Sequence, residues 1–337
     1  MCAPIVRRDN GPMRKQARRT LLKTAGATLA FPAIARSQSA WPNKPIRCIV
    51  PLPPGGGTDT MGRRAMQRLS EALGVPVVVE NKAAAGGTIG SDLVAKADPD
   101  GYTIGIATAS SHSAAPVFRK DLPYDPVKSF TAITMLGTTP YILIGGPAAN
   151  AKDLASVIVN AKAAQGKMTC ASVGVSTLGY LLTKQFEQLA GVQFTDVTYR
   201  GSALAYPELM NGTVAVMLDN PSGSAGLVRD GRLTAYAVTR PSPVLPNVPT
   251  FESLGVKGFD AVFWYGVVAP AGFPIAYANR IQKALADSFL VDPGSASLRA
   301  MDVEPVMSTP QDFGAAIARQ TAELKVLADR LGIKPTE

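Results

Sequence analysis

The chain is poor in the side chains that most often build metal and nucleophilic sites. Its 337 residues include one histidine, His112, and three cysteines. A metal site made of several histidines is therefore excluded, and the cysteines lack the spacing of a zinc site. Cys48 and Cys170 fall in apolar strand patterns, where we expect buried free thiols; a disulfide between them is the alternative. We expect no metal and no cofactor.

The chain also has little net charge outside its first 40 residues. The formal net charge is +9, but residues 1–40 hold eight of the 34 basic residues and only one of the 25 acidic ones. The remainder is close to neutral. The basic excess therefore gives no reason to expect a nucleic acid as partner.

No apolar run reaches the ~20 residues that a membrane-spanning helix needs. The apolar run at 24–31 follows a basic stretch and precedes small residues up to Ala40, as in a cleaved export signal. Within it, 18-RRTLLK-23 has the arginine pair of a twin-arginine signal. We predict export to the periplasm with removal of residues 1–40. The alternative is an N-terminal membrane anchor.

Short β-rich runs alternate with helical patterns along the rest of the chain. Strand patterns at 46–51, 75–80 and 102–108 enclose helical patterns at 58–73 and 88–97. The alternation restarts with helices at 154–164 and 178–190 and strands at 168–172, 194–199, 214–218 and 233–239. This pattern predicts two open α/β domains with parallel-type sheets.

Two further strand patterns, at 133–144 and 261–269, are the expected crossings between the domains. Helical patterns at 274–289 and 310–331 follow the second crossing and are expected to pack back onto the first domain. We predict residues 41–140 plus 263–337 as domain 1 and residues 141–262 as domain 2, with a ligand cleft between them.

Four polar or glycine-rich loops follow strands, where ligands bind in open α/β sheets. In 50-VPLPPGGGTDTMGRR-64, three glycines precede a helical pattern, so backbone N–H groups and a helix N-terminus can face an anion. The alternative is a tight turn capped by Thr58 or Asp59. The other loops are 83-AAAGGTIG-90, 108-TASSHS-113 and 172-SVGVSTLG-179. Together they predict a ligand held by neutral hydrogen bonds and helix termini.

Nucleotide-binding motifs fit the first loop poorly. A Walker loop needs Lys and then Ser or Thr after the last glycine, where this chain has Thr58 and Asp59. A Rossmann fingerprint needs a third glycine, where 55-GGGTDT-60 has Thr60. Glu80 does end the second strand, where a ribose-binding acid is expected. A dinucleotide-binding α/β enzyme is therefore the alternative function.

The sequence also lacks the motifs of a serine hydrolase. Segment 174-GVSTLG-179 is one residue too long for the G-x-S-x-G motif, and its serine would depend on His112 as the sole base. We expect His112 in a turn or at the surface. The sequence thus predicts no catalytic residue.

Several segments occur in the order and spacing of a known family. They are VPLPPGGGTDT, VVVENKAAAGGTIG, PDGYTIGIAT, LPYDPVKSF, YRGSALA, VMLDN, LTAYAVT and FWYGVVAPAG. From residue 41 to the C-terminus the chain resembles the Bug family, the periplasmic solute receptors of tripartite tricarboxylate transporters. The resemblance implies a two-domain fold like that of type II periplasmic binding proteins, which closes like a Venus flytrap on a small carboxylate. It also implies a monomer without catalysis whose partners are membrane permease subunits; a sensor protein is the alternative partner.

The resemblance further implies which residues bind the ligand, with the amides of the first loop and Thr58 holding its carboxylate. Those in domain 1 are Pro51, Leu52, Pro53, Gly55, Gly56, Gly57, Thr58, Asp59, Gly86, Gly87, Thr88, Ser110 and Ser111. Those in domain 2 are Ser176, Thr177, Arg200, Gly201, Ser202 and Asp219. For Asp219 the alternative is that it orients the loops without touching the ligand.

The chain departs from the family pattern at two places. It has 176-STLGY-180 instead of a longer Gly/Ser run followed by His-Leu, and Pro53 and Pro54 replace small residues. We expect Tyr180 and the prolines to reshape the pocket, so the ligand need not be a common dicarboxylate. Lys184 and Arg200 could seat a second carboxylate; the alternative is that both are solvated charges.

Overall fold

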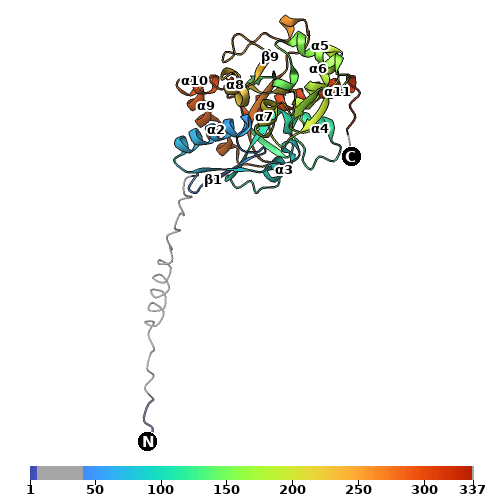
Figure 1. Cartoon of the computed structure of the whole chain (residues 1–337). Coiled ribbons are helices and arrows are strands. Elements are labelled where there is room, and N and C mark those ends of the chain that lie inside the picture. The colour runs from blue at the N-terminus through green and yellow to red at the C-terminus, as the bar shows by residue number, and fades with distance from the viewer. Residues whose placement is uncertain (6–40, 336–337) are drawn as a thin grey trace. The chain divides into compact units, whose positions relative to one another are not determined.

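The computed structural model describes residues 1–5 and 41–335 (Figure 1). The predicted export signal, residues 1–40, therefore lies outside the described residues except for its first five. Of the helices in the described ranges, none is both long and apolar enough to cross a membrane.

The first sheet has six strands in the order β11-β4-β10-β3-β1-β2. Strand β1 runs parallel to β2 and β3, whereas β10 runs antiparallel to β3 and β4. Its elements are β1 (Ile46–Val50), α2 (Gly57–Leu73), β2 (Val77–Asn81), η1 (Ala85–Gly87), α3 (Thr88–Ala95), β3 (Thr103–Thr108), η2 (Ala109–Ala114), α4 (Ala115–Phe118), β4 (Phe130–Pro140), β10 (Val262–Pro270), α9 (Ile275–Phe289), α10 (Gly294–Arg299), β11 (Glu304–Pro305) and α11 (Pro310–Arg330).

The second sheet has five strands in the order β7-β6-β8-β5-β9. Strand β6 runs parallel to β7 and β8, and β5 runs antiparallel to β8 and β9. Its elements are β5 (Ile142–Gly145), η3 (Pro147–Ala149), α5 (Leu154–Ala163), β6 (Thr169–Ser172), α6 (Leu178–Ala190), β7 (Thr195–Thr198), α7 (Ser202–Asn211), β8 (Val216–Asp219), α8 (Pro221–Arg229), β9 (Thr234–Val238) and η4 (Glu252–Leu254).

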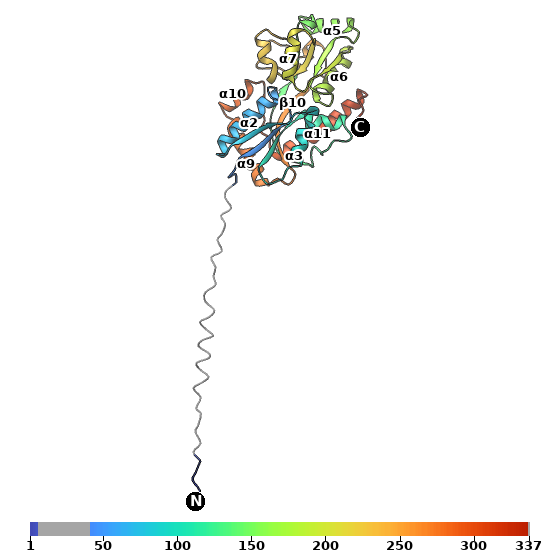
Figure 2. The ribbon, with the colours of Figure 1, turned by 60° about the horizontal axis from the view of Figure 1, so that its bottom comes forward.

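The predicted fold class, two α/β sheets covered by helices, is confirmed, but each sheet is mixed rather than purely parallel. The strand pattern at 133–144 is two strands, β4 of the first sheet and β5 of the second, separated at Tyr141. The chain passes from the first sheet to the second between β4 and β5 and returns between β9 and β10, and each of these four strands has an antiparallel neighbour. Figure 2 shows α5, α6 and α7 at one end of the folded body and α2, α3, α9 and α11 at the other, with β10 between them.

Helix α2 illustrates how the sequence dictates an element of the first sheet. Its buried apolar residues Met61, Ala65, Leu69 and Leu73 recur every four positions and so form one face. Burial of each large side chain on that face contributes about 1.5–3 kcal/mol. The helix ends at Gly74, whose left-handed backbone (φ 71°) suits glycine and whose N–H bonds to the Ser70 carbonyl.

The C-terminal helices return to the first sheet, as the sequence predicted. Helices α9 and α11 pack against β4, and α9 also packs against α2. The predicted free thiols are confirmed too: Cys48 on β1 and Cys170 on β6 are buried in different sheets. Burial raises the pKa of each thiol to about 12, so both are protonated and unreactive at neutral pH.

Candidate functional site

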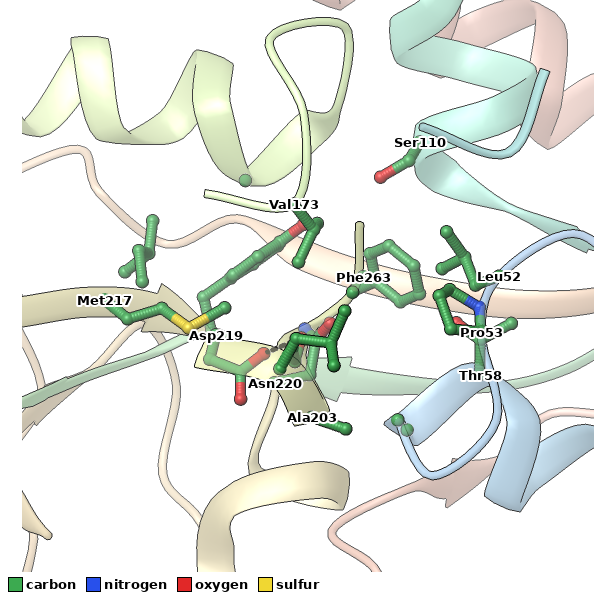
Figure 3. Close-up of a pocket in the computed structure, with 18 of the residues that line it drawn as sticks. Leu52, Pro53, Thr58, Ser110, Val173, Ala203, Met217, Asp219, Asn220 and Phe263 are labelled. Atoms are coloured by element: carbon green, nitrogen blue, oxygen red, sulfur yellow. Dashed lines mark hydrogen bonds between the residues drawn. The ribbon is translucent and has the colours of Figure 1, made fainter. Parts of the chain in front are cut away.

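A cavity of about 50 Å³ lies between the two sheets, at the carboxyl ends of β1, β3, β6 and β8 (Figure 3). In Figure 3, Leu52, Pro53, Thr58 and Ser110 lie on one side of it, and Val173, Met217 and Asp219 lie on the other. The full lining is Leu52, Pro53, Pro54, Gly56, Gly57, Thr58, Ser110, Tyr141, Val173, Gly179, Gly201, Ser202, Ala203, Leu204, Met217, Leu218, Asp219, Asn220 and Phe263.

The loop between β1 and α2 is held in shape by Asp59 from behind. The Asp59 carboxylate accepts hydrogen bonds from the Gly55 N–H (3.1 Å), from Arg63 Nε (2.9 Å) and from Asn81 Nδ2 (2.8 Å). Asn81 Nδ2 also donates to the Leu52 carbonyl (2.9 Å). Asp59 thus ties the loop to the end of β2 and does not line the cavity.

The charge state of Asp59 follows from these contacts. Burial alone would raise the pKa of this carboxyl, but the hydrogen bonds from Arg63, Asn81 and Gly55 outweigh burial and lower the pKa. Asp59 is therefore ionised at neutral pH and keeps the loop in place. Its hydrogen bonds give Asp59 a structural role in the loop, and ligand contact by Asp59 stays a prediction.

Three helices begin at the cavity without a capping side chain. Their N-cap residues Gly56 (α2), Gly201 (α7) and Asn220 (α8) all line the cavity, and within the described residues none receives a side-chain cap bond. By contrast, the Thr177 side chain caps α6, and Asp153 caps α5 away from the cavity. The positive ends of α2, α7 and α8 therefore face the cavity, where an anion would be favoured.

Two hydroxyl groups that line the cavity have no hydrogen-bond partner among the described residues. Thr58 is 5% exposed and Tyr141 is 3% exposed, and both line the cavity. Neither oxygen is among the fully buried polar atoms that lack a partner, so both hydroxyls are open to the cavity. Burial, together with nearby Tyr265 and Asp219, raises the pKa of Tyr141, so its hydroxyl stays protonated and can donate.

Asp219 organises the wall formed by the second sheet. It ends β8, and its carboxylate accepts hydrogen bonds from Ser202 Oγ (2.9 Å) and Tyr206 Oη (2.7 Å) on α7. Burial raises the pKa of this carboxyl, and the bonds from Tyr206, the Asn220 backbone and Ser202 oppose that shift. Asp219 thus fixes the start of α7 beside β8, the orienting role considered from the sequence, and it also lines the cavity.

Aromatic rings from the crossing strands form another wall. The rings of Tyr141 and Phe263 meet edge to face with centroids 6.0 Å apart, and Phe263 meets Tyr265 at 5.0 Å. The Tyr265 hydroxyl is 2.8 Å from Ser222 Oγ on α8. The cavity therefore combines an apolar wall with a few polar groups, as small-molecule sites do.

Loops of the two sheets touch each other around the cavity. The Leu178 N–H donates to Ser110 Oγ across the cleft (3.2 Å). A Cβ atom added at Gly201 would lie 2.9 Å from Pro53 Cγ, and one added at Gly86 would lie 3.1 Å from Thr177 Cγ2. The cleft is therefore narrow, and glycines allow the close approach of its two sides.

The predicted ligand-binding residues divide into two groups. Those that line the cavity are Leu52, Pro53, Gly56, Gly57, Thr58, Ser110, Gly201, Ser202 and Asp219. Those outside the lining are Pro51, Gly55, Asp59, Gly86, Gly87, Thr88, Ser111, Ser176, Thr177 and Arg200. Within the second group, Ser111 is fully buried and bonds to His112 and Thr108, and Arg200 is exposed. Ligand contact by any of these residues stays a prediction.

Sequence reasoning missed several residues of the lining. Tyr141 and Phe263 lie where the chain crosses between the sheets, in segments predicted only as connections between the domains. Val173 and Met217 are apolar residues at strand ends, which resemble core residues in a sequence. The available signal was an apolar or aromatic residue at the point where the chain passes from one sheet to the other. Such a residue faces the cleft and could have been predicted to line the ligand site.

Other expectations are corrected by the structure. His112 is not in a turn at the surface: it is fully buried with its ring 4.6 Å from that of Phe130, and burial lowers its pKa to about 3. Tyr180 does not line the cavity but packs against Phe118. Lys184 pairs with Asp196 (2.7 Å) and Glu187 (3.1 Å).

The residue considered for ribose binding is engaged elsewhere. Glu80 pairs with Arg47 (3.0 Å) and Lys82 (3.6 Å) on the strand surface and is absent from the cavity lining.

Comparison with protein families places these features in context. Residues 61–333 match the model of the tripartite tricarboxylate transporter family receptor. The chain is 34% identical over 307 residues to Protein BugT of Bordetella pertussis (strain Tohama I). This alignment covers 88% of this chain and 93% of that protein.

Solved structures share the fold over most of the chain. The periplasmic binding protein BugD matches with a TM-score of 0.84 and 29% identity over 88% of this chain and all of that one. Rpa4515 of R. palustris with adipate matches with a TM-score of 0.85 and 30% identity, with the same coverage. MatC (Rpa3494) from Rhodopseudomonas palustris with bound malate matches with a TM-score of 0.81 and 26% identity over 85% of this chain and 99% of that chain.

Proposed function

Because the chain belongs to the tripartite tricarboxylate transporter receptor family, we propose that it captures a small organic acid in the periplasm and delivers it to membrane permease subunits. The family and its structural neighbours are solute-binding receptors rather than enzymes. Two of the neighbours carry adipate and malate, both carboxylates.

The observation that carries the proposal is the polar side of the cavity. Three helix N-termini without a capping side chain face it, and the Thr58 hydroxyl, which lines the cavity at the start of α2, has no partner among the described residues. Backbone N–H groups at helix N-termini and a hydroxyl donor match the oxygens of a carboxylate. In this proposal Gly56, Gly57 and Thr58 bind the carboxylate, and Ser110, Gly201 and Ser202 complete its surroundings.

The proposal includes two domains that close on the ligand. Domain 1 would comprise residues 41–140 plus 263–337, and domain 2 residues 141–262. The division is supported by the separate sheets and by the crossings at Tyr141 and before β10. A ligand that touches loops of both domains favours the closed state.

Export is part of the same proposal. Residues 1–40 would act as a cleaved signal of the twin-arginine type, supported by the sequence 18-RRTLLK-23 and by the periplasmic binding proteins among the relatives. Delivery to permease subunits is supported by the family alone.

Thermal unfolding of residues 41–337 with a panel of organic acids tests the binding step. We expect at least one mono- or dicarboxylate to raise the melting temperature, because a ligand that binds only the folded state stabilises it. NAD and ATP serve as controls and should leave the melting temperature unchanged. A shift with a nucleotide and with no acid would refute the receptor function.

A further inference from the structure

The segments that cross between the sheets have two faces, and only one of them borders the candidate ligand cavity. Tyr141 and Phe263 line that cavity. Their neighbours Pro140 and Val262 are paired with each other across β4 and β10 and line a different cavity. Because successive side chains of an extended chain point to opposite faces, this second cavity, here called the rear cavity, lies behind the crossing segments. None of the described residues lines both cavities.

The two walls of the rear cavity belong to different sheets. Arg240 and Pro243 lie on the segment that follows β9 of the second sheet. Glu304 lies on β11, which pairs with β4 of the first sheet. The walls meet where Ser242 lies beside the buried carboxyl of Asp302. A rotation of one sheet against the other therefore changes the width of the rear cavity.

A buried hydroxyl ties the two crossing points together. The Thr239 hydroxyl accepts a hydrogen bond from the Tyr141 N–H (2.8 Å) and donates one to the Ala261 carbonyl (2.6 Å). The Thr239 N–H also donates to the Tyr141 carbonyl (2.8 Å). Thr239 is 4% exposed and lines neither cavity. The two crossings are thus held next to each other, as the axis of a hinge requires.

The charged side chains of the rear cavity do not lock its walls together. Arg299 pairs with Glu304 (3.1 Å) within the wall of the first sheet. Arg240 lies 3.8 Å from Asp260, just before β10. Both pairs are exposed and so are weak. Among the described residues no ion pair joins the segment after β9 to α10 or β11, so charge does not fix the width of the rear cavity.

The two cavities differ in width in the way that a closed cleft requires. The ligand cavity holds about 50 Å³, and loops of the two sheets touch around it where the Leu178 N–H donates to Ser110 Oγ. The rear cavity holds about 290 Å³. When two bodies rotate about an axis between two gaps, one gap widens as the other narrows.

We propose that the width of the rear cavity controls closure of the ligand cleft, so that Pro243 and Glu304 are positioning residues that set ligand affinity without touching the ligand. A larger side chain in the rear cavity resists opening of the cleft and raises the fraction of closed protein. The apparent affinity rises with the fraction of protein that is competent to bind. This inference rests on the proposed receptor function.

The variant Pro243→Trp fills the rear cavity from the wall of the second sheet. Calorimetric titration of residues 41–337 with the acid that most raises the melting temperature should show about threefold tighter binding than in the original chain. Pro246→Trp is the matched control, because Pro246 is an exposed proline of the same loop outside both cavities, and it should leave affinity unchanged. Equal affinities of Pro243→Trp and the original chain would overturn the inference and leave the receptor function intact. Binding of no acid by the original chain would overturn the receptor function itself.

The variant Glu304→Trp fills the same cavity from the opposite wall and should also tighten binding. Its control is Glu304→Gln, which removes the ion pair with Arg299 without filling the cavity and should leave affinity unchanged. Small-angle X-ray scattering without ligand gives a readout that a purely local role would not move. Both Trp variants at 243 and 304 should have a smaller radius of gyration than the original chain, because more of the protein is closed. Unchanged radii in both variants would show that the rear cavity does not control closure.

Discussion

Among single residues, Thr58 and Asp59 are neighbours in the sequence with different roles. Successive residues of a helix point about 100° apart, so Thr58 faces the cavity while Asp59 faces the end of β2. Both stand in the first turn of α2. At the start of α2, Thr58 is thus a candidate ligand contact, whereas Asp59 holds the preceding loop in shape.

The variant Thr58→Val should weaken binding of the best acid by about fivefold, because the isosteric side chain loses one hydrogen bond of roughly 1 kcal/mol. The melting temperature without ligand should change little, since this hydroxyl bonds to no other described residue. Thr234→Val is the control, because Thr234 is exposed on β9 outside the cavity lining. Calorimetry on both variants measures the effect. If Thr58→Val binds the acid as tightly as the original chain does, the Thr58 hydroxyl does not contact the ligand.

His112 makes the stability of the folded protein depend on pH. Its folded-state pKa is about 3, whereas the unfolded chain has the ordinary value of 6.5. Between these values the unfolded state binds more protons, so stability present above pH 6.5 is lost as the pH falls toward 3, by at most about 1.4 kcal/mol per pH unit.

Urea unfolding at a series of pH values from 7 to 4 tests this effect of His112. The loss of unfolding free energy on acidification should be smaller in His112→Gln than in the original chain, even if the variant is less stable throughout. Parallel pH profiles for the two proteins would contradict the assigned burial of the imidazole.

Among whole elements, regular periodicity decided what the sequence could predict. Helix α2 was expected at 58–73 and occupies Gly57–Leu73, because its apolar face recurs along four turns. Helices α7 and α8 were not expected: α7 contains Pro207, and α8 is rich in Gly, Ser and Pro. Both begin beside the cavity, where packing against β8 and α2 replaces intrinsic helix propensity.

Local sequence patterns also predicted only part of the candidate site. Glycine and hydroxyl residues at strand ends are visible in a sequence, and loops 51–58 and 201–202 do reach the cavity. The loop at 86–88 was equally conspicuous but touches Thr177 of the facing loop instead. Which polar loop lines a cavity and which one only closes it depends on tertiary distances that no local pattern encodes.

The start of α7 offers a test of closure through Gly201→Ala. The backbone of Gly201 is extended (φ −179°), so alanine is conformationally acceptable there, but its Cβ would lie 2.9 Å from the rigid ring of Pro53. We expect ligand affinity to fall about tenfold, because the two sides of the cleft can no longer approach. Calorimetric titration of the variant with the best acid measures this loss.

Two further variants control for this effect. Gly226→Ala on α8 should leave affinity unchanged, since no heavy atom of the described residues outside the adjoining helix backbone lies within 4 Å of its added Cβ. Pro53→Ala combined with Gly201→Ala should recover most of the lost affinity, because the ring that clashes is gone. No recovery would mean that Gly201 acts through the cap of α7 and not through contact with Pro53.

At the scale of the molecule, the two sheets and the strands that cross between them create the site. Three helix N-termini come together only because parallel strands of both sheets end at the same cleft, and Tyr141 and Phe263 reach it only because they lie at the crossings. The sequence order of strands and helices predicted two sheets, and tertiary packing determined which residues meet between them.

A crystal structure of residues 41–337 with the most tightly bound acid would show directly where the ligand binds. We expect the ligand in the cavity between the sheets, with carboxylate oxygens within hydrogen-bond distance of the Thr58 hydroxyl and the N–H groups at the start of α2. An acid bound elsewhere, or bound in the cavity with its carboxylate turned away from α2, would contradict this expectation.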